Sequence, residues 1–123
     1  MFDDIAFHAT LPASDLARAK QWYRDTLGLT PVDEMEGASW YESGGARFLL
    51  YESTFAGTNQ ATAATLGATD FDAAITRLRE AGVTFEEYDL GEITTDDGVL
   101  TTPDGFRVAW FKDSEGNILS IGE

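Results

Sequence analysis

The sequence predicts an α+β fold made of two copies of one β-α-β-β-β (βαβββ) module. The main observation is a phrase that occurs twice, TLPASDL at residues 10–16 and TLGATDF at residues 65–71. Each copy follows a strand-like stretch and opens a helix-like one, as expected for an internal repeat. We therefore expect one domain over residues 1–123, made of a module at 1–56 and a module at 57–123.

The first module contains the clearest periodic patterns. Residues 2–11 alternate in a way that predicts a strand, with Ile5, Phe7, Ala9 and Leu11 on one face. Ser14 or Asp15 is placed to cap a helix with apolar residues at helical spacing, and Gly28 ends it. Turn-like glycines then separate three more predicted strands, at 30–35, 38–42 and 47–52.

The second module repeats this plan after a polar linker at residues 53–60. A strand is expected at 61–68, followed by a helix that Thr69 or Asp70 caps and Gly82 ends. Asp-Gly pairs at 97–98 and 104–105 indicate hairpin turns. The remaining predicted strands are 83–88, 106–112 and 118–121.

Charge and composition limit the classes of partner. The chain has 22 acidic and 8 basic residues and a formal net charge of −14, so it should repel nucleic acid and anionic membranes. The same charge suits either a solubility surface or the attraction of a cationic ligand. No cysteine is present, which excludes disulfides and thiolate zinc sites. The first residues, MFDD, show no signal-peptide pattern, and we expect a cytoplasmic protein.

Two longer motifs add a family resemblance, LPASDLARAKQWYRDTLG at residues 11–28 and WFKDSEGNILS at 110–120. With the repeat, they resemble the vicinal oxygen chelate superfamily, which contains glyoxalase I, extradiol dioxygenases and bleomycin-resistance proteins. The resemblance implies the glyoxalase/bleomycin-resistance fold, in which two βαβββ modules form a cupped, partly closed mixed sheet with helices outside. It also implies a ligand cavity inside the cup and a homodimer.

Enzymes of this superfamily hold a divalent metal with one inward residue from each of up to four strands. The resemblance places these positions at His8, Leu49, Ala63 and Ser120. Only His8, the single histidine, is a competent ligand, whereas catalytic divalent sites use about three protein ligands. We therefore expect no metal and no cofactor, with His8 as a ligand only if a divalent metal is present. Catalytic residues remain unknown at this stage.

Residues on the strands that would line or edge the cup predict a ligand surface. Aromatic side chains suit the binding of a flat organic molecule. Core packing is the alternative for each aromatic residue, and a hydrogen-bonded core histidine is the more common role for a residue such as His8. The predicted ligand-binding residues are His8, Trp40, Phe48, Leu49, Val108, Trp110 and Ser120.

These features favour metal-free binding or sequestration of a small organic molecule in the cup. The acidity resembles that of the antibiotic-binding branch of the superfamily, whose ligands are cationic, and antibiotic resistance is the implied role. Two alternatives stay open. One is a metal-dependent lyase, isomerase or dioxygenase that uses His8, and the other is a small interaction module whose cup is filled by its own side chains.

Overall fold

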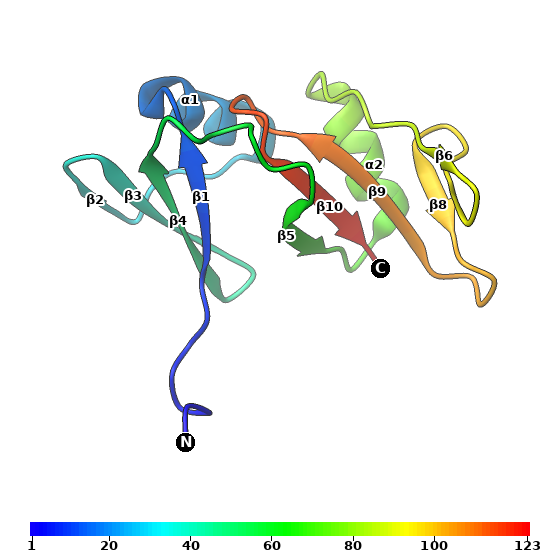
Figure 1. Cartoon of the computed structure of the whole chain (residues 1–123), viewed down its shortest axis with the longest axis horizontal. Coiled ribbons are helices and arrows are strands. Elements are labelled where there is room, and N and C mark those ends of the chain that lie inside the picture. The colour runs from blue at the N-terminus through cyan, green and yellow to red at the C-terminus, as the bar shows by residue number, and fades with distance from the viewer.

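The computed structural model describes all 123 residues and contains two helices and ten strands. The first module holds β1 (Ala9–Ala13), α1 (Leu16–Leu27), β2 (Asp33–Met35), β3 (Ala38–Ser43) and β4 (Ala46–Glu52). The second holds β5 (Thr62–Gly67), α2 (Phe71–Glu80), β6 (Asp89–Leu90), β7 (Ile93–Thr94), β8 (Val99–Thr101), β9 (Arg107–Lys112) and β10 (Ile118–Gly122). Figure 1 shows the two modules side by side, with the N-terminal segment extended away from both.

Each module forms its own four-stranded sheet, in the order β1-β4-β3-β2 and β5-β10-β9-β8. The first strand of each sheet runs parallel to its neighbour and the other pairs are antiparallel. A separate short hairpin joins β6 to β7. The predicted α+β fold is confirmed, and its two sheets do not close, because no hydrogen-bonded ladder connects β1 to β5.

Both helices begin at an aspartate, as the repeat predicts. The side chain of Asp15 accepts a hydrogen bond from the Arg18 backbone N–H (3.0 Å), and Asp70 accepts one from Ala73 (3.1 Å). These carboxylates satisfy backbone donors that the first turn of a helix leaves free. α1 ends at Gly28, whose φ of 70° is a left-handed conformation that glycine adopts without strain.

The helices cover one face of each sheet, and the core lies between them. Tyr23 of α1 packs against Tyr41 and Phe48, whose rings stack on each other at a centroid distance of 5.0 Å. In the second module, Phe111 lies edge-on to Phe85 at 5.8 Å. Burial of such large side chains, each worth roughly 2 to 3 kcal/mol, holds each helix on its sheet.

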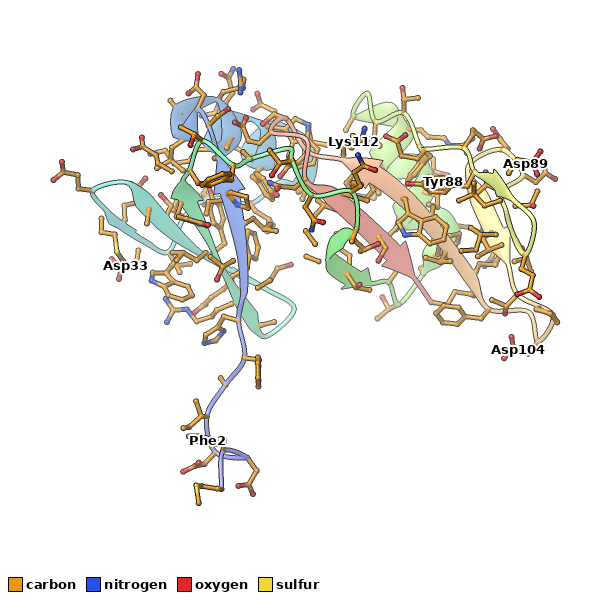
Figure 2. The ribbon with its side chains drawn as sticks, in the orientation of Figure 1. Phe2, Asp33, Tyr88, Asp89, Asp104 and Lys112 are labelled. Atoms are coloured by element: carbon orange, nitrogen blue, oxygen red, sulfur yellow. The ribbon has the colours of Figure 1, made fainter.

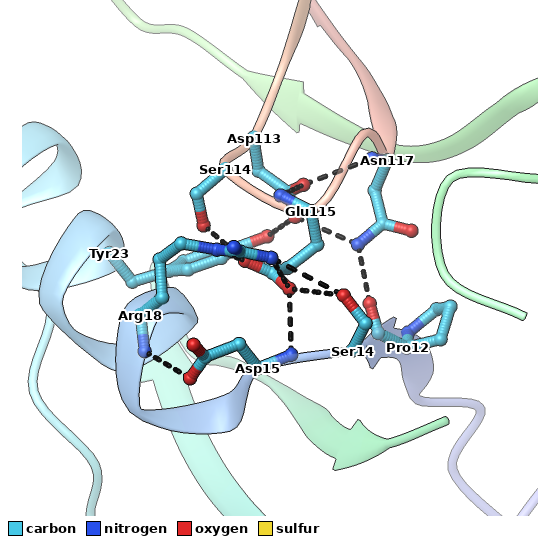
Figure 3. Close-up of polar contacts among 9 residues, drawn as sticks. All are labelled: Pro12, Ser14, Asp15, Arg18, Tyr23, Asp113, Ser114, Glu115 and Asn117. Atoms are coloured by element: carbon cyan, nitrogen blue, oxygen red, sulfur yellow. Dashed lines mark hydrogen bonds and ion pairs between the residues drawn. The ribbon is translucent and has the colours of Figure 1, made fainter. Parts of the chain in front are cut away.

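A buried polar joint connects the two modules where the turn between β9 and β10 meets the start of α1 (Figure 3). The Glu115 carboxylate accepts hydrogen bonds from the Asp15 backbone N–H (3.0 Å) and from the Arg18 guanidinium (2.9 Å). The Arg18 hydrogen bonds lower the pKa of Glu115 to about 2. Glu115 is therefore ionised and anchors the start of α1 to the second module.

The same turn makes a second set of contacts with the first module. Tyr23 donates a hydrogen bond from its hydroxyl to Asp113 (2.6 Å), and Asn117 donates from its amide to the Pro12 carbonyl (2.9 Å). Asp113 in turn accepts hydrogen bonds within its own turn from the Glu115 and Asn117 backbone N–H groups. Because these groups are buried and paired, they fix the angle between the modules.

The predicted first strand, residues 2–11, is wrong at its beginning. The strand starts at Ala9, which pairs with Phe48 near the start of β4. Residues 1–8, named here the N-terminal arm, extend beyond the start of β4 and have no partner strand in this chain. The arm carries a strand-like pattern, but no strand of this chain pairs with it.

The predicted strand at 83–88 is also wrong. That segment is not a strand, and the strand that pairs with β9 on this side is β8. Phe85 is buried against Phe111 and draws the segment toward the helix side, leaving one backbone bond from Glu86 to the Trp110 carbonyl (2.8 Å). The predicted strand at 30–35 is shorter than expected and begins at Asp33.

No helix of the structure is long and apolar enough to span a membrane.

Candidate ligand-binding faces

Each sheet has a face that no helix covers, and we call the two the open faces. Strand registers define them, because residues opposite each other in a ladder point to the same side of a sheet. The open face of the first module carries Thr10, Trp40, Arg47, Leu49 and Tyr51. The open face of the second carries Thr65, Val108, Trp110, Lys112 and Ser120.

The registers also show that the two tryptophans are repeat mates. Trp40 lies opposite Leu49 on the neighbouring strand, and Trp110 lies opposite Ser120. β3 and β9 hold the same place in their sheets. Both indoles are half-buried, so each offers part of an aromatic surface on its open face.

Trp40 has a polar aromatic and a cation as neighbours. The His8 ring is edge-on to it at 5.4 Å, and the Arg47 guanidinium lies over it at 4.8 Å. Nδ1 of His8 donates a hydrogen bond to the Arg47 carbonyl (3.2 Å). This tautomer leaves Nε2 of the exposed imidazole free to accept a hydrogen bond from a ligand.

Trp110 is arranged in a similar way. Tyr88 is edge-on to it at 5.4 Å, and its own Nε1–H donates to the Thr62 hydroxyl (3.2 Å). In Figure 2, Tyr88 lies beside β9, and Lys112 is at the end of that strand. Burial raises the pKa of the Tyr88 phenol, so the hydroxyl is a neutral hydrogen-bond donor at pH 7.

The four positions implied for a metal do not fit a divalent ion. His8 is the one imidazole, Leu49 and Ala63 have no donor atom, and the Ser120 hydroxyl donates to Thr65 (3.0 Å). No three His, Cys, Asp or Glu side chains of the chain come together in a metal-binding group.

The structure separates one predicted ligand residue from the others. Phe48 stacks on Tyr41 on the helix-covered face, whereas its neighbour Leu49 points to the open face. His8, Trp40 and Leu49 share the open face of the first module, and Val108, Trp110 and Ser120 share that of the second.

A cavity of about 700 Å³ forms a groove between the modules, next to both helices. It is lined by Leu11, Leu27 and Phe48 from the first module and by Leu66, Ala74 and Ile121 from the second. Most of the strand residues that line this groove belong to the helix-covered faces, while Arg47 and Thr65 from the open faces also border it. Of the predicted ligand residues, only Phe48 reaches the groove.

Sequence patterns missed two residues of the open faces. Arg47 and Tyr88 flank the two tryptophans, yet neither belongs to a motif with a chemical signature. Strand alternation places Arg47 on the side of Leu49, which was an available signal. Tyr88 lies outside any strand, so no periodic pattern indicates its position.

The chain matches one family model over most of its length. The model of the Glyoxalase/Bleomycin resistance protein/Dioxygenase superfamily matches residues 5–110. The chain belongs to this superfamily. The resemblance drawn from the two motifs is thereby confirmed, while no curated protein sequence matches the chain significantly.

Several solved structures share the fold of this chain at low sequence identity. A glyoxalase family protein from Enterococcus faecalis has a TM-score of 0.75 at 18% identity, with 100% of both chains covered. A bleomycin-binding protein in complex with bleomycin has a TM-score of 0.73 at 16% identity, covering 96% of this chain and 97% of that one. A lactoylglutathione lyase from Agrobacterium tumefaciens has a TM-score of 0.72 at 21% identity, covering 97% and 93%. These likenesses establish the fold.

Proposed function

We propose that this superfamily member binds a small aromatic organic molecule on its open faces without a metal, and so sequesters it. The observation that carries the proposal is the pair of half-buried tryptophans, Trp40 and Trp110, at equivalent positions in the two modules. Aromatic rings that are partly accessible and fixed by neighbours offer a large contact area at little cost in side-chain entropy.

The polar groups beside each ring give the ligand its orientation. Nε2 of His8 is free to accept a hydrogen bond from a ligand beside Trp40, and the Tyr88 hydroxyl is free to donate one beside Trp110. A molecule with a flat ring and a hydrogen-bonding substituent matches this combination. The groups present support binding and orientation, and they include no nucleophile paired with a base.

Charge favours a cationic ligand of the antibiotic type. The net charge of −14 attracts cations over long range and raises their rate of encounter. Arg47 already lies over the Trp40 ring, so Trp110 is the ring expected to contact the positive group. The bleomycin-binding protein with the same fold, solved with bleomycin, is consistent with such a role in antibiotic resistance.

We propose a two-fold homodimer as the working assembly, with the open faces near the interface. β1 and β5 each pair with only one neighbour and leave a free edge. Free edges are commonly covered by another chain. A cytoplasmic location is part of the same proposal and is tested by cell fractionation.

Tryptophan fluorescence tests the ligand class. The protein is titrated with cationic, neutral and anionic aromatic molecules, and we expect the tightest binding for cations, weakening as salt is added. Trp110→Ala should weaken binding at least about tenfold, whereas Trp22→Phe on α1 should leave it unchanged. If anionic molecules bind as tightly as cationic ones, and Trp110→Ala does not change the affinity, the proposal is refuted. That result would favour an interaction module whose cup is filled by its own side chains.

Metal analysis separates binding from metal-dependent chemistry. We expect purified protein to carry far less than one equivalent of zinc, nickel, manganese or iron, and added metal to leave its melting temperature unchanged, since a native-state ligand must stabilise the fold. The His8→Ala variant is the control. A tight equivalent of metal that His8→Ala releases would instead support a lyase, isomerase or dioxygenase.

A further inference from the structure

The open face of the second module carries hydroxyl groups beside Trp110. Thr62 and Thr65 of β5 contribute two of them, on either side of a β-bulge at Ala63. In a regular strand, residues three apart point to opposite faces of the sheet, and the extra residue of a bulge changes that alternation. Both threonines therefore lie on the open face, and both are exposed.

Each of these threonines ends a short chain of hydrogen bonds. Nε1–H of Trp110 donates to the Thr62 hydroxyl at 3.2 Å, and the Ser120 hydroxyl donates to that of Thr65 at 3.0 Å. Because each threonine oxygen accepts, its own O–H hydrogen is left free, and accepting a hydrogen bond makes an O–H group a stronger donor. With the hydroxyl of Tyr88, three free donors lie around one half-buried indole.

The first module has no such chain, although its open face repeats the same row of positions. Thr10 is the repeat mate of Thr65, and Leu49 stands where the second module has Ser120. Since Leu49 has no hydroxyl, it cannot donate to Thr10. The row of hydrogen-bonded hydroxyls is therefore a feature of the second module alone.

The chain segment beside this face is strongly acidic. Residues 86–97 hold six acidic residues and no basic one. The segment meets Trp110 at Glu86, whose backbone N–H donates to the Trp110 carbonyl (2.8 Å), and at Tyr88. Lys112, the basic residue of this face, already pairs with Glu86 at 4.0 Å. Charge complementarity therefore favours an ammonium group on the ligand beside Trp110.

We propose that the part of the ligand that lies on Trp110 is an amino sugar ring. One face of a pyranose presents several C–H bonds of weakly positive character, which suit the negative face of an indole. Its oxygens accept from the free hydroxyls of Thr62, Thr65 and Tyr88, and its own hydroxyls can donate in return. Its ammonium group balances the acidic segment. The inference rests on the proposed ligand binding and names the class of ligand.

The hydroxyls distinguish this class from a purely aromatic cation. Such a cation would use the indole face and the charge, as an amino sugar does. It would leave the O–H groups of Thr62 and Thr65 without a partner on the ligand. An amino sugar uses all three features of the face, namely the aromatic surface, the row of donors and the negative charge.

Two probes isolate the contribution of the ligand's hydroxyls. Phenyl 2-amino-2-deoxy-β-D-glucopyranoside, the sugar probe, carries a phenyl ring, an amine and a hydroxylated six-membered ring. The matched compound, trans-2-phenoxycyclohexylamine, keeps the phenyl ring, the amine and the six-membered ring but has no hydroxyl. Isothermal titration calorimetry of EDTA-treated protein at pH 6 measures both affinities. We expect the sugar probe to bind at least about tenfold tighter, as two or more added hydrogen bonds would give.

Variants assign this preference to the proposed hydroxyls. Thr65→Val/Ser120→Ala removes both partners of one hydrogen bond, which is nearly neutral for stability, and it should lower the ratio of the two affinities at least about threefold. Thr62→Val is a second, independent variant with the same expected direction. Thr101→Val, at an exposed threonine of β8 opposite Arg107, is the control and should keep the wild-type ratio. Circular dichroism checks that each variant is folded. A ratio that no threonine variant lowers would overturn the assignment.

The outcomes separate this inference from the proposed function. Equal affinities for the two probes in the wild type, both lost in Trp110→Ala, would overturn the amino sugar and leave the aromatic binding site standing. No binding of either probe, or binding that Trp110→Ala does not weaken, would refute both. Phenyl β-D-glucopyranoside, which lacks the amine, should bind more weakly than the sugar probe. Equal binding of that neutral sugar would overturn the role given to the ammonium group.

Discussion

Glu115 shows how one side chain can hold the two modules in a fixed relative orientation. It is fully buried as a side chain, lies in the turn between β9 and β10, and binds groups of the first module about a hundred residues earlier in the chain. A charge in such a place is stable only when its hydrogen-bonding capacity is filled, as it is here. Arg18, Ser14 and Ser114 supply donors to it.

Replacing this carboxylate should weaken the joint between modules. We expect Glu115→Gln to lower the free energy of unfolding by about 2 to 3 kcal/mol, because hydrogen bonds to a charged group are lost. Glu34→Gln is the matched control, since the Glu34–Lys20 pair is exposed and worth at most about 1 kcal/mol. Urea denaturation measures the unfolding free energy of both variants. Equal losses of unfolding free energy would contradict the role assigned to the polar joint.

The same carboxylate predicts an acid dependence of stability. Its pKa is lowered from 4.5 to about 2, mainly by the Arg18 hydrogen bonds, so its contribution is complete above pH 4.5 and is lost as the pH falls toward 2. The difference in unfolding free energy between wild type and Glu115→Gln should therefore shrink from pH 5 to pH 2. A difference that stays constant over this range would show that the pKa is not lowered.

Two buried tyrosines should respond in opposite ways to loss of the hydroxyl. The Tyr41 hydroxyl is buried without a hydrogen-bond partner, so Tyr41→Phe should leave stability unchanged or raise it by up to about 1 kcal/mol. The Tyr23 hydroxyl donates to Asp113, so Tyr23→Phe should cost about 1.5 to 3 kcal/mol. Thermal melts of the two variants measure the change in stability. A larger loss of stability for Tyr41→Phe than for Tyr23→Phe would contradict this prediction and show that the Tyr41 hydroxyl has a hydrogen-bond partner.

At the scale of elements, local sequence signals predicted much of the fold. They failed where the presence or absence of a neighbouring strand decides whether a segment forms a strand. Capping aspartates and Gly28 place both helices well, because these interactions are local in sequence. The arm and residues 83–88 look like strands, but neither has a neighbouring strand. The sequence did not predict β8, although two predicted Asp-Gly turns enclose it. A strand of three residues is too short to show an alternation of apolar and polar side chains.

The turn before β8 should be sensitive to any side chain at Gly98. An added Cβ there would lie 2.6 Å from Phe85 Cβ, and the residue has a φ of +79°. Gly91 has a nearly identical φ of +78° with open space around it, which makes it the matched control. We expect Gly91→Ala to cost about 1 kcal/mol and Gly98→Ala about 3 kcal/mol or more. Chemical denaturation measures the loss of unfolding free energy in both variants. Equal losses would mean that the Phe85 side chain moves aside at little cost.

At the scale of the whole molecule, the internal repeat was the most useful part of the sequence. It indicated that His8 has no histidine mate at Ala63, and strand registers then paired Trp40 with Trp110. Phe48 could not be assigned to a face from sequence, because its neighbours on both sides are apolar or long. The polar joint was out of reach as well, since its contacts link residues far apart in the chain.

The most direct test of aromatic binding on the open faces is the NMR spectrum of the three tryptophan indole N–H groups. A cationic aromatic ligand added to EDTA-treated protein should shift the Trp40 and Trp110 resonances. The Trp22 resonance should stay in place, because that ring packs against Tyr23 and Phe111 on the helix side. Shifts confined to Trp22, or shifts of Trp40 and Trp110 that appear only after a divalent metal is added, would contradict metal-free binding on the open faces.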